Sequence, residues 1–94
     1  HSFICEKVTI GNKCFISHGV MFVNDLVKSG KINRNSKQFK KTIIGNNVTI
    51  GSNTTILPVK ISNNIVVGAG STVTKDLNIK GIYAGNPAKL IRRL

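Results

Sequence analysis

Acidic residues are scarce in this sequence. Three Asp and Glu oppose fourteen Lys and Arg, which gives a formal net charge of +11 at pH 7. Such a basic chain favours anionic partners, such as nucleic acid, anionic lipid or phosphorylated small molecules. The charge alone does not choose among these partners.

Aromatic residues, membrane-spanning runs and targeting motifs are also lacking. The four phenylalanines and one tyrosine do not alternate with basic residues. No helix-turn-helix or zinc-finger spacing is present, so we expect no nucleic-acid partner. No signal peptide, lipidation motif or apolar run of membrane-spanning length is visible. We therefore expect a cytoplasmic protein with no membrane partner.

Cysteine and histidine are limited to two residues each. Cys5 and Cys14 do not have CxxC or metal-ligand spacing, which favours reduced structural thiols over a disulfide. The histidines, His1 and His18, are too few for the three-histidine zinc site of a carbonic anhydrase. We predict no metal site.

The dominant feature of the sequence is a six-residue period. The fourth residue after the leading position of each hexad is small or apolar, and Gly or Asn is frequent between the two. Because Gly and Asn tolerate tight turns and left-handed backbone, each hexad is predicted to form one short strand and one corner. The leading residues are all apolar and are Ile4, Ile10, Ile16, Phe22, Ile44, Ile50, Ile56, Ile61, Val67 and Val73.

Hexads of this kind predict a coiled, repetitive fold. Three of them close one triangular coil, and coils stack at a strand separation of about 4.8 Å, with the leading residues as an internal ladder. We predict an all-β fold, a left-handed parallel β-helix of hexapeptide repeats over residues 1–86. Because the period is under way by Phe3 and Ile4, we expect further coils N-terminal to this segment. Residues 87–94, which mix apolar and basic side chains, are predicted to form a short C-terminal amphipathic helix.

The period is interrupted twice. If residues 22–25 continue at 42–43, the hexad is complete and residues 26–41 form one external loop, which is polar and basic. Long loops on rigid repeats are usually functional or disordered. The second break is the stretch 56–60, which is one residue short, with Pro58 fitting a corner.

Over nearly its whole length, the chain resembles the hexapeptide-repeat acyltransferases. The most specific matches are HGVMFVND at 18–25, ILPVKI at 56–61, VGAGSTVTKD at 67–76 and YAGNPA at 83–88. The first of these is similar to the N-acetyltransferases of nucleotide-linked 3-amino sugars. The resemblance implies a homotrimer that moves the acetyl group of acetyl-CoA to the amino group of a dTDP- or UDP-linked amino-deoxy sugar. It further implies acetylation at C3, for a surface polysaccharide such as lipopolysaccharide.

Amide formation from a thioester needs an unprotonated amine, a donor for the oxyanion and an acceptor for the amine proton. His18 is the candidate catalytic base, because the ordinary histidine pKa of about 6.5 suits proton transfer at neutral pH. Alternatively, His18 only forms surface hydrogen bonds, since some amino-sugar members of the family work without a protein base. The resemblance makes Asn24 and Asp25 candidate substrate-binding residues, although Asn-Asp is also common in turns.

The resemblance also implies where acetyl-CoA binds. Gly68 and Ala69 are expected to let the pantetheine arm approach the backbone, and Ala84 belongs to the same site. Lys75 and Lys89 are assigned to the CoA phosphates, although exposed cations at these positions are also ordinary surface.

Two other functions remain open. An O-acetyltransferase acting on a sugar or serine hydroxyl would depend more strongly on a base such as His18, because a hydroxyl must be activated to attack. A non-enzymatic solenoid scaffold is also compatible with the repeat, since a fold does not fix a function.

Overall fold

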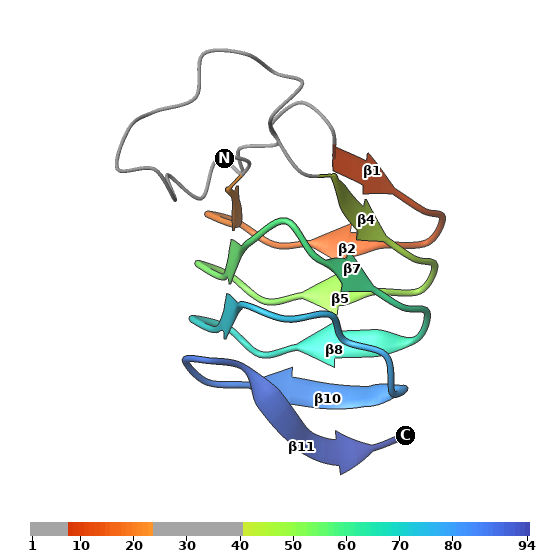
Figure 1. Cartoon of the computed structure of the whole chain (residues 1–94), viewed down its shortest axis with the longest axis vertical. Helices are drawn as coiled ribbons and strands as arrows, with labels where there is room; N and C mark the ends of the chain where they lie inside the picture. Colours follow the sequence, from red (N-terminus) through yellow and green to blue (C-terminus); the bar gives the residue numbers. More distant parts are fainter. Residues whose placement is uncertain (1–7, 24–40) are drawn as a thin grey trace.

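The computed structural model describes residues 8–23 and 41–94, and these residues form a short triangular prism of stacked strands (Figure 1). The strands are β1 (Val8–Ile10), β2 (Phe15–Ile16), β3 (Met21–Phe22), β4 (Thr42–Ile44), β5 (Thr49–Ile50), β6 (Thr55–Ile56), β7 (Lys60–Ile61), β8 (Ile65–Val67), β9 (Thr72–Val73), β10 (Gly81–Ala84) and β11 (Lys89–Arg93). The described part of the chain is all-β, as predicted, and it has no helix that could cross a membrane.

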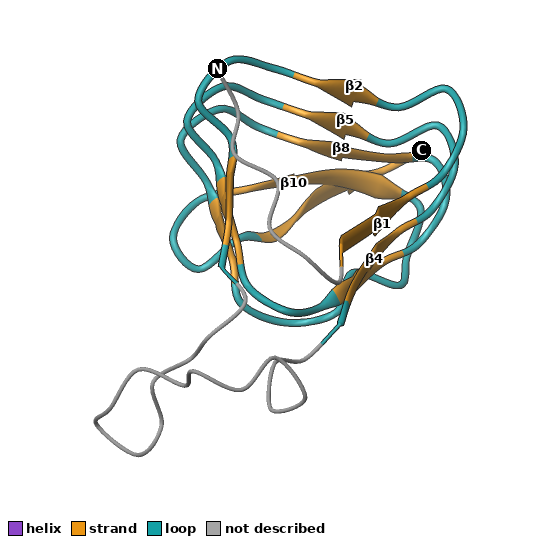
Figure 2. Cartoon of the chain, turned by 90° about the horizontal axis from the view of Figure 1, so that it is seen from above, coloured by secondary structure: helices purple, strands orange, loops and turns teal. Residues whose placement is uncertain are grey.

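The strands form three sheets, one for each face of the prism (Figure 2). Two sheets have three strands, in the orders β1-β4-β7 and β3-β6-β9, and the third has five, in the order β11-β10-β8-β5-β2. The strand pairs of the described residues are parallel, apart from β10 with β11. Each of the first three coils contributes one strand to each face, which is consistent with the predicted left-handed β-helix.

The pairing of the first two coils is consistent with an interruption between β3 and β4. Phe22 pairs with Ile56, and Val8 pairs with Thr42. Both pairs are 34 residues apart, whereas three hexads span 18 residues, so the first coil contains an insertion between β3 and β4. The bounds of the predicted external loop, 26–41, stay a prediction. Residues 26–40 of the predicted external loop lie outside the described residues.

The next pair of coils confirms the second interruption. Ile44 pairs with Ile61 and Ile56 pairs with Val73, so this coil is one residue shorter than three hexads. Pro58 lies between β6 and β7, where its missing N–H costs no strand-to-strand hydrogen bond.

The leading residues of the hexads form the predicted internal ladder. Of the fourth residues after them, Val20, Val48 and Ile65 are fully buried beside the ladder. Burying one branched side chain contributes roughly 1.5–3 kcal/mol, so these two columns supply most of the hydrophobic stabilisation. The ladder residues of the second and third coils are at most 1% exposed and are Ile44, Ile50, Ile56, Ile61, Val67 and Val73.

Cys14 occupies the second of these columns in the first coil. It is half-buried and carries a free thiol, as expected. Its Sγ donates a hydrogen bond to the Gly45 carbonyl oxygen at 3.1 Å. Cys5 lies outside the described residues.

One corner of each coil is rich in asparagine, and its backbone is left-handed. The φ angle is 57° at Lys13, 55° at Asn47 and 60° at Asn64. Asparagine tolerates this conformation better than most residues, which is why the sequence pattern predicted turns here. We call this stack of segments the amide corner, and it comprises residues 11–13, 45–47 and 62–64.

The predicted C-terminal helix over residues 87–94 is wrong. This segment contains β11, which pairs antiparallel with β10, and the Leu94 N–H donates to the Lys80 carbonyl oxygen at 3.2 Å. A helix would leave the outer edge of β10 with unpaired N–H and C=O groups, whereas a strand satisfies them. The mixed pattern is that of an edge strand, because Leu90 packs against the core while Ile91 is 67% exposed.

Candidate functional site

Most of the predicted site residues that the structure describes lie along one corner of the prism. This corner joins the five-stranded sheet to the β3-β6-β9 sheet. The parallel register of β2, β5, β8 and β10 stacks its segments one on another. We call it the site corner, and it comprises residues 17–19, 51–53, 68–70 and 84–86.

Three residues occupy the same hexad position on the site corner, one coil apart, namely His18, Ser52 and Ala69. The Asn53 N–H donates to the His18 carbonyl oxygen at 3.0 Å, and the Gly70 N–H donates to the Ser52 carbonyl oxygen at 2.8 Å. These hydrogen bonds tie the backbone of the corner from coil to coil.

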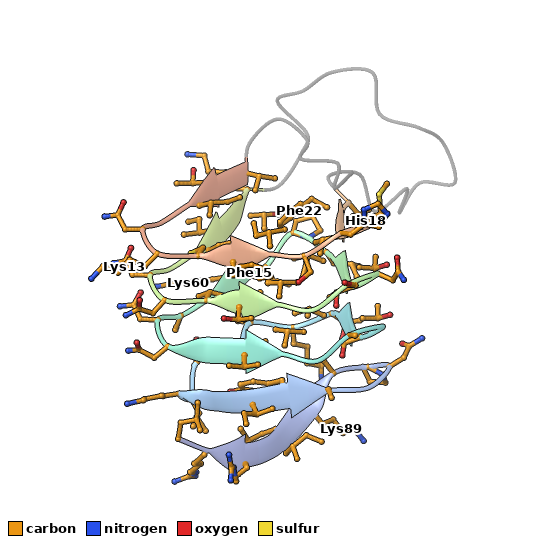
Figure 3. The ribbon with its side chains drawn as sticks, turned by 180° about the vertical axis from the view of Figure 1, so that it is seen from behind. Lys13, Phe15, His18, Phe22, Lys60 and Lys89 are labelled. Atoms are coloured by element: carbon orange, nitrogen blue, oxygen red, sulfur yellow. The ribbon has the colours of Figure 1, made fainter. Side chains whose placement is uncertain are left out.

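His18 is exposed and lies just before β3 (Figure 3). Its backbone is held by the bond from Asn53, so the side chain projects from a fixed point on the surface. Asn24 and Asp25, the predicted substrate-binding residues, lie outside the described residues. Their proximity to His18 therefore stays a prediction.

Small residues at the preceding hexad position let the coils approach closely. A Cβ on Gly51 would lie 2.5 Å from the Ala69 nitrogen, and a Cβ on Gly68 would lie 3.1 Å from the Ala84 Cβ. The structure thus brings together Gly68, Ala69 and Ala84, three of the predicted cofactor-binding residues. Ala69 and the following Gly70 are exposed, so the backbone here reaches the surface.

The two corners differ in how they satisfy their backbone N–H groups. On the amide corner, the Asn12 N–H donates to Asn46 Oδ1, and the Asn46 N–H donates to Asn63 Oδ1, each at 2.7 Å. The equivalent N–H groups of the site corner belong to Ser52 and Ala69. Within residues 8–23 and 41–94, neither of these two has a hydrogen-bond acceptor, because the next coil offers no side-chain amide there.

The N–H groups of Ser52 and Ala69 are therefore available to a ligand. A surface N–H held in a fixed direction can donate to a carbonyl oxygen or to a developing oxyanion. Sequence reasoning did not single out Ser52. It could have been found from the period, since Ser52 has the same hexad position as His18 and Ala69.

Lys75 and Lys89 are both exposed and lie at different places. Lys89 begins β11, and the Ala88 N–H before it donates to the Thr72 carbonyl oxygen at 2.8 Å, which places this end of β11 beside β9. Lys75 follows β9, at the next corner of the coil. Figure 3 shows Lys89 on the same side of the prism as His18, towards the opposite end.

Charge in the described part of the chain is almost entirely positive. Its single acidic side chain, Asp76, accepts a hydrogen bond from the Lys60 N–H at 2.8 Å. A surface of this kind stabilises anionic ligands. No cluster of three or more His, Cys, Asp or Glu that could hold a metal ion occurs in residues 8–23 and 41–94. The cations are Lys13, Lys41, Lys60, Lys75, Lys80, Lys89, Arg92 and Arg93.

Comparison with known proteins identifies the repeat. Residues 41–75 match the family model described as "Hexapeptide repeat of succinyl-transferase". The chain is also 34% identical, over 114 residues, to a protein of Lysinibacillus sphaericus named "Probable macrolide acetyltransferase". That similarity covers 99% of this chain and 63% of the relative.

Two solved structures have the same fold over most of the chain. The polysialic acid O-acetyltransferase OatWY has a TM-score of 0.78 and 34% identity, covering 98% of this chain and 47% of that one. A mutant of the N-acyltransferase AntD from Bacillus cereus, in complex with dTDP and coenzyme A, has a TM-score of 0.74 and 25% identity, covering 92% and 52%. This chain thus spans about half the length of each of these two proteins. It belongs to the hexapeptide-repeat acyltransferase family.

Proposed function

We propose that this chain carries the acyl-CoA site of a cytoplasmic N-acetyltransferase. The enzyme moves the acetyl group of acetyl-CoA to the C3 amino group of a dTDP- or UDP-linked amino-deoxy sugar, for surface polysaccharide. One observation carries the proposal. The site corner aligns the exposed His18 with the N–H groups of Ser52 and Ala69, which have no acceptor among the described residues. AntD, which has the same fold, is an N-acyltransferase that was solved with dTDP and coenzyme A.

The site corner can supply the groups that acyl transfer needs. The sugar amine attacks the thioester carbon, a C–N bond forms, and the C–S bond to CoA breaks as the tetrahedral intermediate collapses. His18 accepts the amine proton and returns it to the departing thiolate. The Ser52 N–H lies one coil from His18, about 4.8 Å along the prism, and is placed to donate to the oxyanion. The Ala69 N–H, one coil further, donates to a pantetheine carbonyl.

The CoA phosphates are assigned to two lysines, and the sugar is assigned to the segment after β3. Lys75 and Lys89 bind the CoA phosphates, supported by the positive charge of the described surface. Asn24 and Asp25 bind the sugar, supported by their position directly after β3 in the sequence. The same scheme requires no metal ion.

A homotrimer is proposed from the outer face of the five-stranded sheet. Phe15 is 64% exposed there, and the register places Thr49, Val66 and Ile82 in the same outward row. This row beside the site corner is apolar except for Thr49, which favours burial against a second copy of the chain. Light scattering on the complete protein measures this directly, and a monomer at working concentration contradicts it.

A second candidate function is O-acetyl transfer to a sugar or serine hydroxyl. Two observations favour it: OatWY, similar in sequence and fold, is an O-acetyltransferase, and His18 is exposed and accessible to a hydroxyl. A hydroxyl has greater need of such a base than an amine does.

A panel of sugar acceptors separates N-acetyl transfer from O-acetyl transfer. The complete protein is incubated with acetyl-CoA, and free thiol is measured with dTDP- and UDP-linked 3-amino and 4-amino sugars. Matched sugars with a hydroxyl in place of the amine serve as controls. We expect thiol release with a 3-amino sugar and none with its hydroxyl counterpart. Release with the hydroxyl acceptors alone assigns the protein to O-acetyl transfer.

A further inference from the structure

A buried hydroxyl lies directly beneath the site corner. Ser71 is 1% exposed, and its Oγ donates to the Gly68 carbonyl oxygen at 2.6 Å. Thr54, which is fully buried in the neighbouring coil, donates its Oγ1 to the same carbonyl oxygen at 3.2 Å. The Gly68 carbonyl is therefore directed towards two buried side chains.

This arrangement sets the direction of the next N–H group. The Gly68 carbonyl and the Ala69 N–H belong to one peptide unit, which is planar and trans, so they point in opposite directions. Holding the Gly68 oxygen towards Ser71 and Thr54 turns the Ala69 N–H outward. Ala69 is exposed, and its N–H has no acceptor within the described residues.

Ser71 also joins the next coil to this peptide. Its Oγ accepts a hydrogen bond from the Gly85 N–H at 3.2 Å, and the Gly85 carbonyl oxygen accepts one from the Thr72 N–H at 3.0 Å. Gly85 follows Ala84, whose Cβ faces Gly68. One hydroxyl thus links two neighbouring segments of the site corner, whereas Thr54 makes only the longer bond to Gly68.

We propose that Ser71 is a positioning residue for acyl-CoA, which fixes the Gly68–Ala69 peptide so that the Ala69 N–H faces the pantetheine arm. This inference rests on the proposed function. Ser71 does not touch the ligand. It acts through the orientation of one peptide, so its loss weakens CoA binding and leaves the acceptor side of the reaction unchanged.

The test measures CoA affinity by calorimetry on the complete protein, which needs no knowledge of the acceptor. Ser71→Ala removes both hydrogen bonds, and we expect the Kd for CoA to rise about tenfold. Ser71→Cys keeps the size of the side chain but offers only a weak thiol donor, and it provides the same comparison if the alanine variant does not fold. Ser71→Thr retains the hydroxyl and is expected to bind CoA within about threefold of the wild type.

Two matched variants separate positioning from general destabilisation. Thr54→Val removes only the longer bond to Gly68, and we expect a rise in Kd of about two- to threefold. Thr42→Val changes a buried threonine on the β1-β4-β7 sheet, away from the site corner, and should not alter CoA affinity. The inference is overturned if Ser71→Ala and Ser71→Cys bind CoA as Thr42→Val does. A wild-type protein that does not bind CoA contradicts the proposed function instead, so the two failures are distinguishable.

Discussion

The hydroxyl of Tyr83 is bonded to both backbone groups of Ile79. It donates to the Ile79 carbonyl oxygen at 2.6 Å and accepts from the Ile79 N–H at 3.2 Å. The ring of Tyr83 is 6% exposed and stacks in register with Val67. One side chain therefore extends the ladder and also closes the turn that leads into β10.

Replacing Tyr83 by Phe tests this double role. The ring stays buried, but the backbone groups of Ile79 lose their partner, and we expect the free energy of unfolding to fall by about 1–3 kcal/mol. Urea denaturation measures the change. Tyr83→Leu, which also loses ring packing, should fall further. An unchanged midpoint for Tyr83→Phe would show that water replaces the hydroxyl at no cost.

His18→Asn tests the proton transfer. Asparagine keeps a polar side chain at the surface but cannot accept the amine proton, so we expect kcat to fall by about 10²–10⁴-fold. The Kd for CoA should stay within about twofold, because the pantetheine contacts are proposed for other coils. Steady-state thiol release and calorimetry measure the two quantities. A kcat within threefold of the wild type contradicts a catalytic His18.

Two glycines of the site corner provide a matched test of the close packing between coils. A Cβ on Gly51 would lie 2.5 Å from the Ala69 nitrogen, whereas a Cβ on Gly70 meets nothing within 4 Å. Gly51→Ala must separate two coils and should lower the free energy of unfolding by about 2–3 kcal/mol. Gly70→Ala carries only the strain of its φ of +71°, about 1–2 kcal/mol. Equal thermal stability of the two variants would contradict the close contact.

The cations assigned to CoA are tested by removing charge. Lys75→Gln and Lys89→Gln should each weaken CoA binding by roughly threefold to tenfold at low salt, and the difference from the wild type should shrink as salt is added. Lys13→Gln, on the amide corner, is the control and should have no effect. Calorimetry at two salt concentrations provides the measurement. Equal weakening of CoA binding in all three variants would indicate that Lys75 and Lys89 act only through the general positive charge of the surface.

Much of the fold was predictable, because the hexad period is local and repeats many times. Ile44, Ile50 and Ile56 share one spacing, and their ladder follows from it. The spacing also predicted an insertion between Phe22 and Ile44, and the pairing of Phe22 with Ile56 is consistent with it. The sequence carries this information in its spacing alone.

The C-terminal segment was not predictable in the same way. Eight residues that mix Leu90 and Ile91 with basic side chains fit a helix or a strand equally well. The segment is a strand because it pairs with the outer edge of β10, whose N–H and C=O groups would otherwise be unpaired. This unpaired edge exists only once the preceding coils have formed, so the sequence of the segment alone does not reveal it.

The candidate site was predictable in part. Gly68, Ala69 and Ala84 came from resemblance to a family, and the register places them together. The availability of the Ala69 N–H was not foreseeable, because it depends on which side chain the next coil places opposite. The bond from Ser71 to Gly68 likewise becomes visible only in three dimensions.

Because β11 reverses direction against β10, no further parallel coil can stack on that strand. The distance from the histidine to the end of the prism is therefore fixed by a whole number of coils. Three strand spacings separate the coil of β2 from that of β10, about 14 Å. In the proposed site, distances along the stack therefore change only in steps of one coil. Adding a coil would move the phosphate end of CoA by about 4.8 Å without changing any residue that holds it.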